Sequence, residues 1–304
     1  RPESRMPDSP HRLFVTGGRG RLASLVADHF RAPAHEVQLF SRVAGHGFHA
    51  LDELTSGRCF DAGTILHLAW STLPATSEQS PGTEARHDLP LLDNMLESLA
   101  RSPARDRSHF VFFSTGGAVY GNAPGRPNVE SDPCHPVSCY GRAKRAAEEM
   151  VEAHAARLGL ACTILRISNP YGYPVPQSRA QGLIPHALRC AVEGQPLHLW
   201  GDGSARKDFL YYTDFLSALE LVISRRLTGL YNLCAGESHS VHEVIGLVAA
   251  HTGRPVRLQP QPAPAWDVHD SRLDPTRFAA ATGWRPQVSL DEGIRRAAAG
   301  YAAT

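Results

Sequence analysis

A glycine-rich turn between an apolar segment and a helical segment is the feature that most constrains the fold. The run His11–Val15 predicts a short buried strand, and Ser24–Phe30 is typical of a helix. The turn between them reads Thr16-Gly17-Gly18-Arg19-Gly20-Arg21-Leu22-Ala23. Its spacing fits both G-x-x-G and G-x-G-x-x-G/A, in which glycines let the backbone turn tightly and approach a pyrophosphate at a helix N-terminus. The order of strand, turn and helix predicts a dinucleotide-binding unit.

Strand-like and helix-like segments alternate from this unit to Asn169. Further strands are expected at Glu36–Phe40, Thr64–Ala69, Phe110–Ser114 and Ala161–Ile167, and helices at Leu89–Leu99 and Tyr140–Leu158. The nearly continuous apolar run Phe110–Ser114 is typical of a strand covered on both faces of a sheet. We therefore expect an α/β fold of the Rossmann type, with a doubly wound parallel sheet over residues 11–169.

The composition changes after Asn169, where Pro170, Gly172, Pro174 and Pro176 indicate a crossover to a second region. Short helices are expected there at Gly182–Glu193, Val241–Thr252 and Leu290–Ala298. We expect residues 170–208 and 237–304 to form a smaller α+β substrate-binding region, with residues 209–236 returning to the Rossmann domain.

Composition excludes several classes of function. The 304 residues carry 31 basic and 30 acidic side chains, a net charge of +1, so there is no global signature of nucleic-acid or membrane binding. The apolar runs are too short to span a bilayer, and residues 1–10 lack the apolar core of a secretory signal.

The six cysteines form no C-x-x-C motif, which suits reduced thiols in a cytoplasmic protein. Cys134, His135 and Cys139 have no fourth ligand to pair with, so we expect a loop there and no metal.

Tyr140 and Lys144 lie four residues apart at the start of a predicted helix, which places both side chains on one helical face. A phenol ordinarily loses its proton near pH 10. An ammonium about 4 Å away would lower the pKa of that phenol by roughly three units at an effective dielectric constant of about 20. Such a pair can take a proton from a sugar or alcohol hydroxyl. For an isolated match, an exposed helix N-terminus is the alternative interpretation.

Together these segments resemble the extended short-chain dehydrogenase/reductase family, in particular its nucleotide-sugar epimerase/dehydratase branch. The resemblance runs from Leu13 to about Gly293. Besides the glycine turn and the Tyr140/Lys144 pair, it rests on His67-Leu68-Ala69, Ser114-Thr115-Gly116-Gly117-Ala118-Val119-Tyr120-Gly121, Leu165-Arg166-Ile167-Ser168-Asn169-Pro170-Tyr171-Gly172, Gly201-Asp202-Gly203-Ser204-Ala205-Arg206-Lys207-Asp208-Phe209 and Thr282-Gly283-Trp284-Arg285-Pro286.

The resemblance implies a role for each matching position. Tyr140 would be the acid/base residue, and Lys144 would hold the nicotinamide ribose and lower the pKa of Tyr140. The other cofactor-binding positions would be Gly17, Gly18, Arg19, Gly20, Arg21, Leu22, Leu68 and Ala69. The substrate would meet Asn169 at its diphosphate, together with Leu183, Arg206 and Lys207. The segments Gln181–Ile184 and Leu197–Trp200 would line the pocket for its nucleotide base.

The sequence departs from the family pattern where the resemblance places a catalytic Ser or Thr, because that position is Gly116. The nearest hydroxyls are Thr115 and Ser114, so either of them or a water would contact the reacting oxygen; a strand-end cap is the alternative role for Ser114. The family's dehydratases carry an Asp-Glu pair where this chain has Gly117 and Ala118. A 4,6-dehydratase is therefore not expected.

The cofactor and diphosphate positions also differ. The second strand ends in Ser41-Arg42 instead of an acid that would bind the ribose of NAD, so these residues can hold a 2′-phosphate. The cofactor is then NAD or NADP, with NADP favoured, unless Arg42 is only a solvated loop residue. Lys207 and Pro264 stand where the family has arginines, which implies weaker or differently arranged diphosphate binding.

Three hypotheses follow. The first is a nucleotide-sugar epimerase, acting at C4 by transient hydride transfer to the nicotinamide. The second is an NADPH-dependent ketoreductase of a deoxysugar or another natural-product intermediate, and the third is a dinucleotide-binding regulator without turnover. By resemblance we expect a homodimer that associates through the helices Leu89–Leu99 and Tyr140–Leu158.

Overall fold

The computed structural model describes residues 10–56, 61–173 and 181–302. Pro174 and Pro176 of the expected crossover lie outside the described residues, as do Cys59 and the first nine residues.

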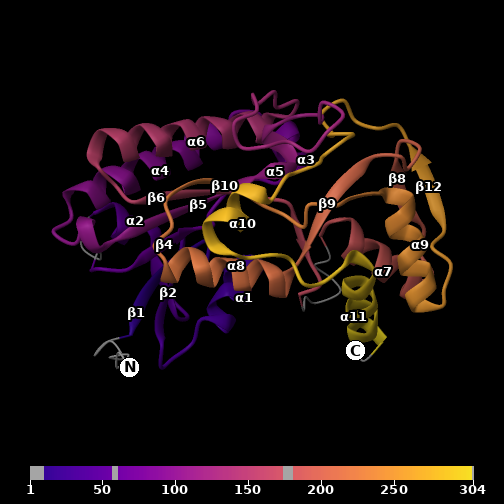
Figure 1. Cartoon of the computed structure of the whole chain (residues 1–304), viewed down its shortest axis with the longest axis horizontal. Coiled ribbons are helices and arrows are strands. Elements are labelled where there is room, and N and C mark those ends of the chain that lie inside the picture. Colours follow the sequence, from indigo (N-terminus) through magenta and orange to yellow (C-terminus); the bar gives the residue numbers. More distant parts are fainter. Residues whose placement is uncertain (1–9, 57–60, 174–180, 303–304) are drawn as a thin grey trace.

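A seven-stranded sheet forms the centre of the first region (Figure 1). Its strands are β1 (His11–Thr16), β2 (His35–Ser41), β3 (Phe48–Ala50), β4 (Thr64–His67), β5 (His109–Thr115), β6 (Cys162–Ile167) and β10 (Gly229–Leu233). Their order is β10-β6-β5-β4-β1-β2-β3, and every neighbouring pair is parallel. The direction of winding reverses between β1 and β4, the place where such sheets bind ligands. The expected doubly wound parallel sheet is confirmed.

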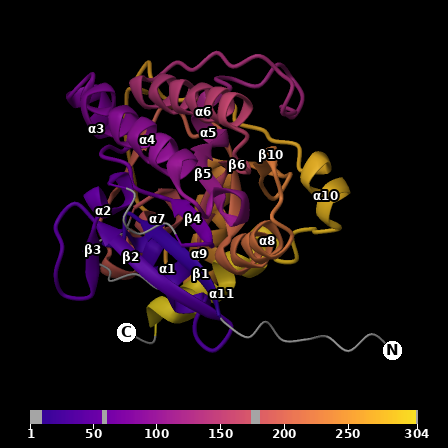
Figure 2. The same cartoon turned by 90° about the vertical axis from the view of Figure 1, so that its left-hand side faces the viewer.

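Helices cover both faces of this sheet. One face carries α1 (Arg21–His29), α8 (Tyr212–Ser224) and α10 (Thr276–Thr282), and the other carries α2 (Leu51–Thr55), α4 (Thr83–Arg101) and α6 (Cys139–Leu158). Figures 1 and 2 show α4 and α6 side by side above the sheet, with α1 and α8 below it. Each layer has its own apolar core, because the strands are buried on both sides. The short α3 (Pro74–Gln79), η1 (Arg105–Arg107) and α5 (Gly116–Val119) lie in the connections.

The second region packs against the carboxyl ends of the strands. It contains a three-stranded sheet, β11 (Ser238–Ser240), β9 (Arg206–Tyr211) and β7 (Asn169–Tyr171), and a pair of strands, β12 (Leu258–Gln261) and β8 (Leu197–Trp200). The helices α7 (Leu183–Glu193), α9 (Val241–Thr252) and α11 (Leu290–Ala302) enclose a third apolar core with them. The Ser240 hydroxyl accepts a hydrogen bond from Glu243 N (3.1 Å) and so fixes the start of α9.

Most expected elements are present, and the differences have simple causes. β3 and α2 were not predicted, because a strand of three residues and a helix of five give too short a pattern. α4 begins at Thr83 rather than Leu89, since its first two turns carry polar residues on the buried face.

In the part of the chain that the structure describes, no helix is long and apolar enough to cross a membrane. The five cysteines within it are all free thiols, as expected from their spacing.

Candidate active site

The glycine turn connects β1 to α1 at the point where the sheet reverses its winding. Gly17 has φ +73°, and a Cβ atom there would lie 3.0 Å from the Ala69 backbone, so only glycine fits. Gly18 N donates to Phe40 O (2.8 Å), and Gly20 N donates to Gly17 O (2.7 Å). Leu68 and Ala69 therefore lie directly against the turn, while Arg21 and Leu22 open the first turn of α1. This close-packed cradle at a helix N-terminus fits the pyrophosphate of a dinucleotide.

The end of β2 carries a cluster of arginine and serine beside the turn. Arg19 Nε donates to Ser41 Oγ (3.1 Å), and the Arg19 guanidinium lies 4.7 Å from the centre of the Phe48 ring. Ser41 is buried and Arg42 is exposed. From the sequence, Ser41 and Arg42 were expected to bind a 2′-phosphate. In the structure, Arg19 contacts Ser41 and so lies at the same position.

Tyr140 and Lys144 share one face of α6, as predicted. The Ser138 hydroxyl accepts from Gly141 N (2.9 Å) and so begins the helix one residue before Tyr140. Lys144 is 5% exposed; its Nζ donates to Phe113 O (2.9 Å). The same ammonium lies 3.8 Å from the centre of a Trp70 ring and 5.9 Å from the Tyr140 ring centre.

The electrostatics of this pair differ from the prediction. Burial lowers the pKa of Lys144 to about 7, although Asp88, Glu148 and Glu84 act to raise it. Burial raises the pKa of Tyr140, and Glu84 and Asp88 raise it further. The pKa shift of Tyr140 in this structure is therefore opposite in direction to the one expected from the sequence, because burial and the two carboxylates dominate it.

Ser114 is bonded within a buried network and does not face the cavity. Its hydroxyl donates to Glu148 Oε1 (2.5 Å), which also accepts from Arg166 Nε (3.0 Å). Glu148 Oε2 accepts from Arg166 Nη2 (2.7 Å) and Arg145 Nη1 (3.0 Å). Ser114 thus fills neither role expected from the sequence, a catalytic hydroxyl or a strand-end cap. Thr115, in contrast, lines the cavity.

Gly116 has a physical reason to lack a side chain. A Cβ atom built there would overlap Leu273 Cδ1 and lie 3.2 Å from Arg166 O. At Gly117 there is room, because the nearest atoms to such a Cβ are Thr115 Oγ1 (3.9 Å), Asn169 Nδ2 (4.0 Å) and Ser271 Oγ (4.0 Å). The polar groups beside the cavity therefore converge on Gly117, one residue after the family's hydroxyl position.

A cavity of about 600 Å³ lies between the two regions. Asn169, Leu183 and Lys207 line it, as expected for substrate-binding positions. Lys207 Nζ donates to Asp267 Oδ1 (2.9 Å) and to Val268 O. Trp200, in a segment expected to face a base, meets the ring of Trp266 edge to face at 5.1 Å on the cavity wall; Trp266 was not predicted there.

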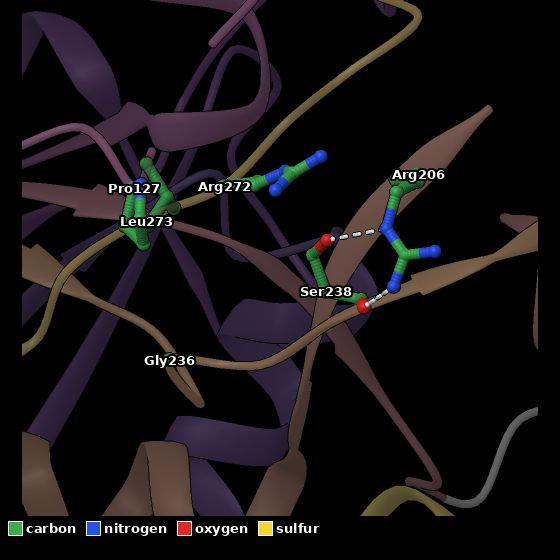
Figure 3. A pocket seen from close by; sticks show the side chains of 6 residues that line it. All are labelled: Pro127, Arg206, Gly236, Ser238, Arg272 and Leu273. Carbon is green, nitrogen blue, oxygen red and sulfur yellow. Dashed lines mark hydrogen bonds between the residues drawn. The ribbon is translucent and has the colours of Figure 1, made fainter. Parts of the chain in front are cut away.

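Arg206 does not join this cavity. Successive side chains of β9 point to opposite faces, so Arg206 points away from Lys207. Its Nε donates to Ser238 Oγ (3.1 Å), and it lines a separate pocket of about 440 Å³ (Figure 3). Figure 3 also shows Arg272 and Leu273 on the wall of this second pocket. The prediction of Arg206 as a substrate-binding residue is not supported by this placement.

The sequence-based prediction missed Trp70 and two buried acids of α4, Glu84 and Asp88. The sequence did contain a pattern that indicates these acids are buried. Glu84 and Asp88 precede Leu92 and Leu96 at intervals of four residues, so all four side chains lie on the same buried face of α4. A carboxylate on a buried helical face points to a partner at a site.

A glycine cradle at the reversal point of a parallel sheet, with a Tyr/Lys pair on a helix that begins at the wall of a cavity, is typical of a dinucleotide-dependent enzyme of the Rossmann type. The sequence model of the NAD dependent epimerase/dehydratase family matches residues 13–234, and the chain belongs to this family. It is therefore an NAD(P)-dependent enzyme of the extended short-chain dehydrogenase/reductase type, as the sequence predicted.

Curated relatives and solved structures agree with this assignment. The UDP-glucose 4-epimerase of Mycolicibacterium smegmatis is 26% identical, over 94% of this chain and 96% of the relative. The UDP-glucose 4-epimerase of Thermus thermophilus, solved with NAD, is 28% identical, with a TM-score of 0.86 over 96% of this chain and 99% of that one. The Thermotoga maritima UDP-glucose 4-epimerase, solved with UDP-glucose, is 27% identical, with a TM-score of 0.85 and the same coverage.

Proposed function

We propose that this protein is a nucleotide-sugar 4-epimerase. The observation that carries the proposal is the Tyr140/Lys144 pair in the first turns of α6, whose N-cap residue Ser138 lines a cavity that both regions of the molecule enclose. Tyr140 and Lys144 themselves are not among the residues that line this cavity. The relatives named as UDP-glucose 4-epimerases match this chain over nearly its whole length. A UDP-sugar is accordingly the proposed substrate, with Asn169 and Lys207 near its diphosphate.

A nicotinamide dinucleotide held at the glycine turn would supply reversible hydride chemistry at the sugar. Tyr140 would take the proton of the C4 hydroxyl and give it back, and Lys144 would orient the nicotinamide ribose. The raised pKa of Tyr140 suits the returning step, in which the phenol acts as an acid. Thr115 and Asn169 would hold the substrate oxygens above Gly117.

The same geometry argues against dehydration. Eliminating water needs an acid and a base besides the tyrosine, and Gly117 and Ala118 carry neither on the wall of the cavity. The acids of α4, Glu84 and Asp88, are buried and are not among the residues that line the cavity.

The test is turnover of UDP-glucose and UDP-galactose, with NAD or NADP added and the sugar products separated. We expect isomerisation without net change of the cofactor. Tyr140→Phe should lose turnover by at least about 100-fold because general acid–base catalysis is removed, and it should still bind cofactor. Cofactor binding by the wild type without turnover of either sugar would reject the epimerase in favour of the regulator.

A second candidate, an NADPH-dependent ketoreductase, is favoured by the Arg19–Ser41 contact with Arg42 beside it. Two arginines and a serine can bind a 2′-phosphate by charge-assisted hydrogen bonds. A dTDP-4-dehydro-6-deoxyglucose reductase of Escherichia coli is 27% identical over 76% of this chain. Steady consumption of NADPH with a 4-keto sugar would establish this candidate.

We also propose a cytoplasmic homodimer that associates through the outer faces of α4 and α6. The apolar stripe Leu92–Leu99 is buried against the subunit's own sheet, so the contact would use the polar outer faces, including the exposed side chains of Asp93 and Arg157. Sedimentation velocity tests this association directly.

A further inference from the structure

Lysine is rare in this chain, and both lysines lie at the proposed site. Only Lys144 and Lys207 occur among the 31 basic residues; the other 29 are arginines. Lys207 lines the cavity, and Lys144 lies beside Tyr140 on α6. An ammonium can lose its proton when it is buried, whereas a guanidinium stays charged. The protonation state of Lys144 therefore matters, and the structure shows what surrounds it.

Lys144 is buried with little direct compensation for its charge. Its Nζ donates to a carbonyl oxygen, that of Phe113 (2.9 Å), and lies over the faces of Trp70 and Phe112. Within the described ranges, no carboxylate forms a direct ion pair with it. A buried ammonium needs an opposite charge nearby to remain protonated.

Three carboxylates act on Lys144, and all three accept hydrogen bonds from other groups. Glu148 is bound by the guanidinium groups of Arg166 and Arg145. Glu84 accepts a hydrogen bond from the Thr72 hydroxyl. Asp88 keeps one buried oxygen without a hydrogen-bond donor among the described residues and has the largest of the three effects on Lys144. Burial raises the pKa of Asp88, and Ser71 and Lys144 act to lower it.

Asp88 has the burial and the free acceptor oxygen that a counter-ion requires. It is 3% exposed, and its Oδ1 accepts from Ser71 N (3.0 Å) and Ser71 Oγ (2.9 Å). Its Oδ2 is buried, with no hydrogen-bond partner in the part of the chain that the structure describes. Ser71 directly follows Trp70, whose ring lies against the Lys144 ammonium. The adjacent residues Trp70 and Ser71 therefore contact the Lys144 ammonium and the Asp88 carboxylate, respectively.

The remaining titratable neighbour does not compete. His67 is fully buried, with Nδ1 at 2.9 Å from Thr16 Oγ1, and burial lowers its pKa to about 3. It is neutral at physiological pH and adds no charge. The groups that face Lys144 from β4, α4 and α6 are thus His67, Glu84, Asp88, Tyr140 and Glu148, and Asp88 is the carboxylate with an uncommitted oxygen.

We propose that Asp88 is the counter-ion that keeps Lys144 protonated beside Tyr140. Asp88 touches no reactant and is a positioning residue, which acts through Lys144. The consequence for catalysis rests on the proposed function, whereas the charge on Lys144 is a property of the protein alone.

The test is a pH titration of Lys144 by NMR, on full-length protein labelled biosynthetically with ε-¹³C lysine. Two lysine signals are expected, and Lys207→Arg assigns the remaining one to Lys144. Asp88→Asn keeps the shape and an acceptor for Ser71 but removes the charge. We expect Lys144 to titrate about one pH unit lower in this variant, because an opposite charge has been withdrawn. At pH 7 its protonated fraction would fall about fivefold.

Glu84→Gln is the matched control, since it removes the other buried acid one turn away on α4 and should move the titration less. Asp88→Ser serves as a second charge-removing variant if Asp88→Asn does not fold, as judged by circular dichroism. An unchanged Lys144 titration in the folded variant would overturn the proposal, as would a larger shift in Glu84→Gln.

Activity provides the link to catalysis. In Asp88→Asn, the alkaline limb of the pH profile of kcat should move down together with the NMR titration. If the wild type turns over no nucleotide sugar while the NMR shift is present, the proposed function fails and the counter-ion role stands. Normal turnover with an unshifted Lys144 would instead support the proposed function and reject the counter-ion role.

Discussion

The Leu273 side chain fills the space that a side chain at Gly116 would need, although 157 positions separate the two residues in the sequence. The Leu273 side chain is 1% exposed, so it cannot swing into solvent to admit a larger residue. The departure from the family pattern at Gly116 is therefore compensated by packing from a distant segment.

We expect Gly116→Ser to cost about 1–3 kcal/mol in the free energy of unfolding, because it overpacks a closed space. Urea denaturation measures this cost. Gly117→Ser is the matched control and should cost less, since a Cβ there has no neighbour closer than 3.9 Å. Adding Leu273→Ala to Gly116→Ser should recover part of the loss in a double-mutant cycle. Strict additivity of the two changes would show that they do not share the space.

Arg19 should contribute to cofactor choice. We expect Arg19→Ala to weaken NADPH binding about tenfold or more, because a charge-assisted hydrogen bond to the 2′-phosphate is lost, with little change for NADH. Fluorescence titration with both cofactors measures the two affinities. Arg31→Ala, an exposed arginine paired with Asp28, is the control. Equal weakening for NADH and NADPH would mean that Arg19 does not contact a 2′-phosphate.

The sequence predicted some site residues well and others poorly, for identifiable reasons. The spacing of Tyr140 and Lys144 alone places them together, since helical periodicity is local. Ser114 was misjudged because its partner Glu148 lies on another element and leaves no mark near Ser114. Arg206 was misjudged because the alternation of β9 was not applied to its neighbour Lys207.

At the scale of elements, a buried charge network joins α6 to β5 and β6. Glu148 is fully buried and Arg166 is 2% exposed, and two hydrogen bonds of 3.0 and 2.7 Å connect them. The Arg166 guanidinium also lies 4.6 Å from the Tyr120 ring centre. The network ties the helix that carries Tyr140 to the strands beneath it.

Glu148→Gln should destabilise the protein by about 3 kcal/mol or more, because it leaves the Arg166 charge buried without a partner. The free energy of unfolding in urea measures this effect. Glu149→Gln removes an exposed partner of Arg145 from the same helix and should cost under about 1 kcal/mol. Similar losses in the two variants would show that burial does not strengthen the Glu148 interaction.

The sequence predicted the long elements and not the short ones. The helix at α6 was placed within one residue, since twenty residues give a clear pattern and Gly159 ends it with φ +67°. β3 gives almost no pattern, yet its Phe48 supports Arg19 at the cofactor end of the sheet.

At the scale of the whole molecule, buried histidines make stability depend on pH. Burial lowers the pKa of His67 to about 3 and that of His109 to about 4, while in the unfolded chain both titrate near 6.5. Below about pH 6.5 the unfolded chain therefore binds protons that the folded protein cannot accept. Stability should fall as the pH drops from about 6.5 toward 4.

Asp208 has the opposite effect on stability, because burial raises its pKa to about 6. As the pH falls, the folded protein protonates Asp208 before the unfolded chain does, and this favours the folded state. Two histidines with larger shifts outweigh this one carboxyl. We expect a lower free energy of unfolding at pH 5 than at pH 7, measured with urea at both values. His109→Gln should flatten the dependence, since it keeps a polar group near Thr163 without a titrating ring. Rising stability between pH 7 and 5 would contradict the assignment of neutral buried histidines.

The contact of Leu273 with Gly116 has an evolutionary consequence. The family pattern matches residues 13–234, so Leu273 lies beyond the part of the chain that defines membership. A lineage that acquires a serine or threonine at position 116 must accept a smaller residue at position 273, and a lineage that keeps leucine at 273 is held to glycine at 116. A change of the residue at position 116 should therefore be accompanied by a substitution at position 273, and the two positions should covary among descendants of this protein.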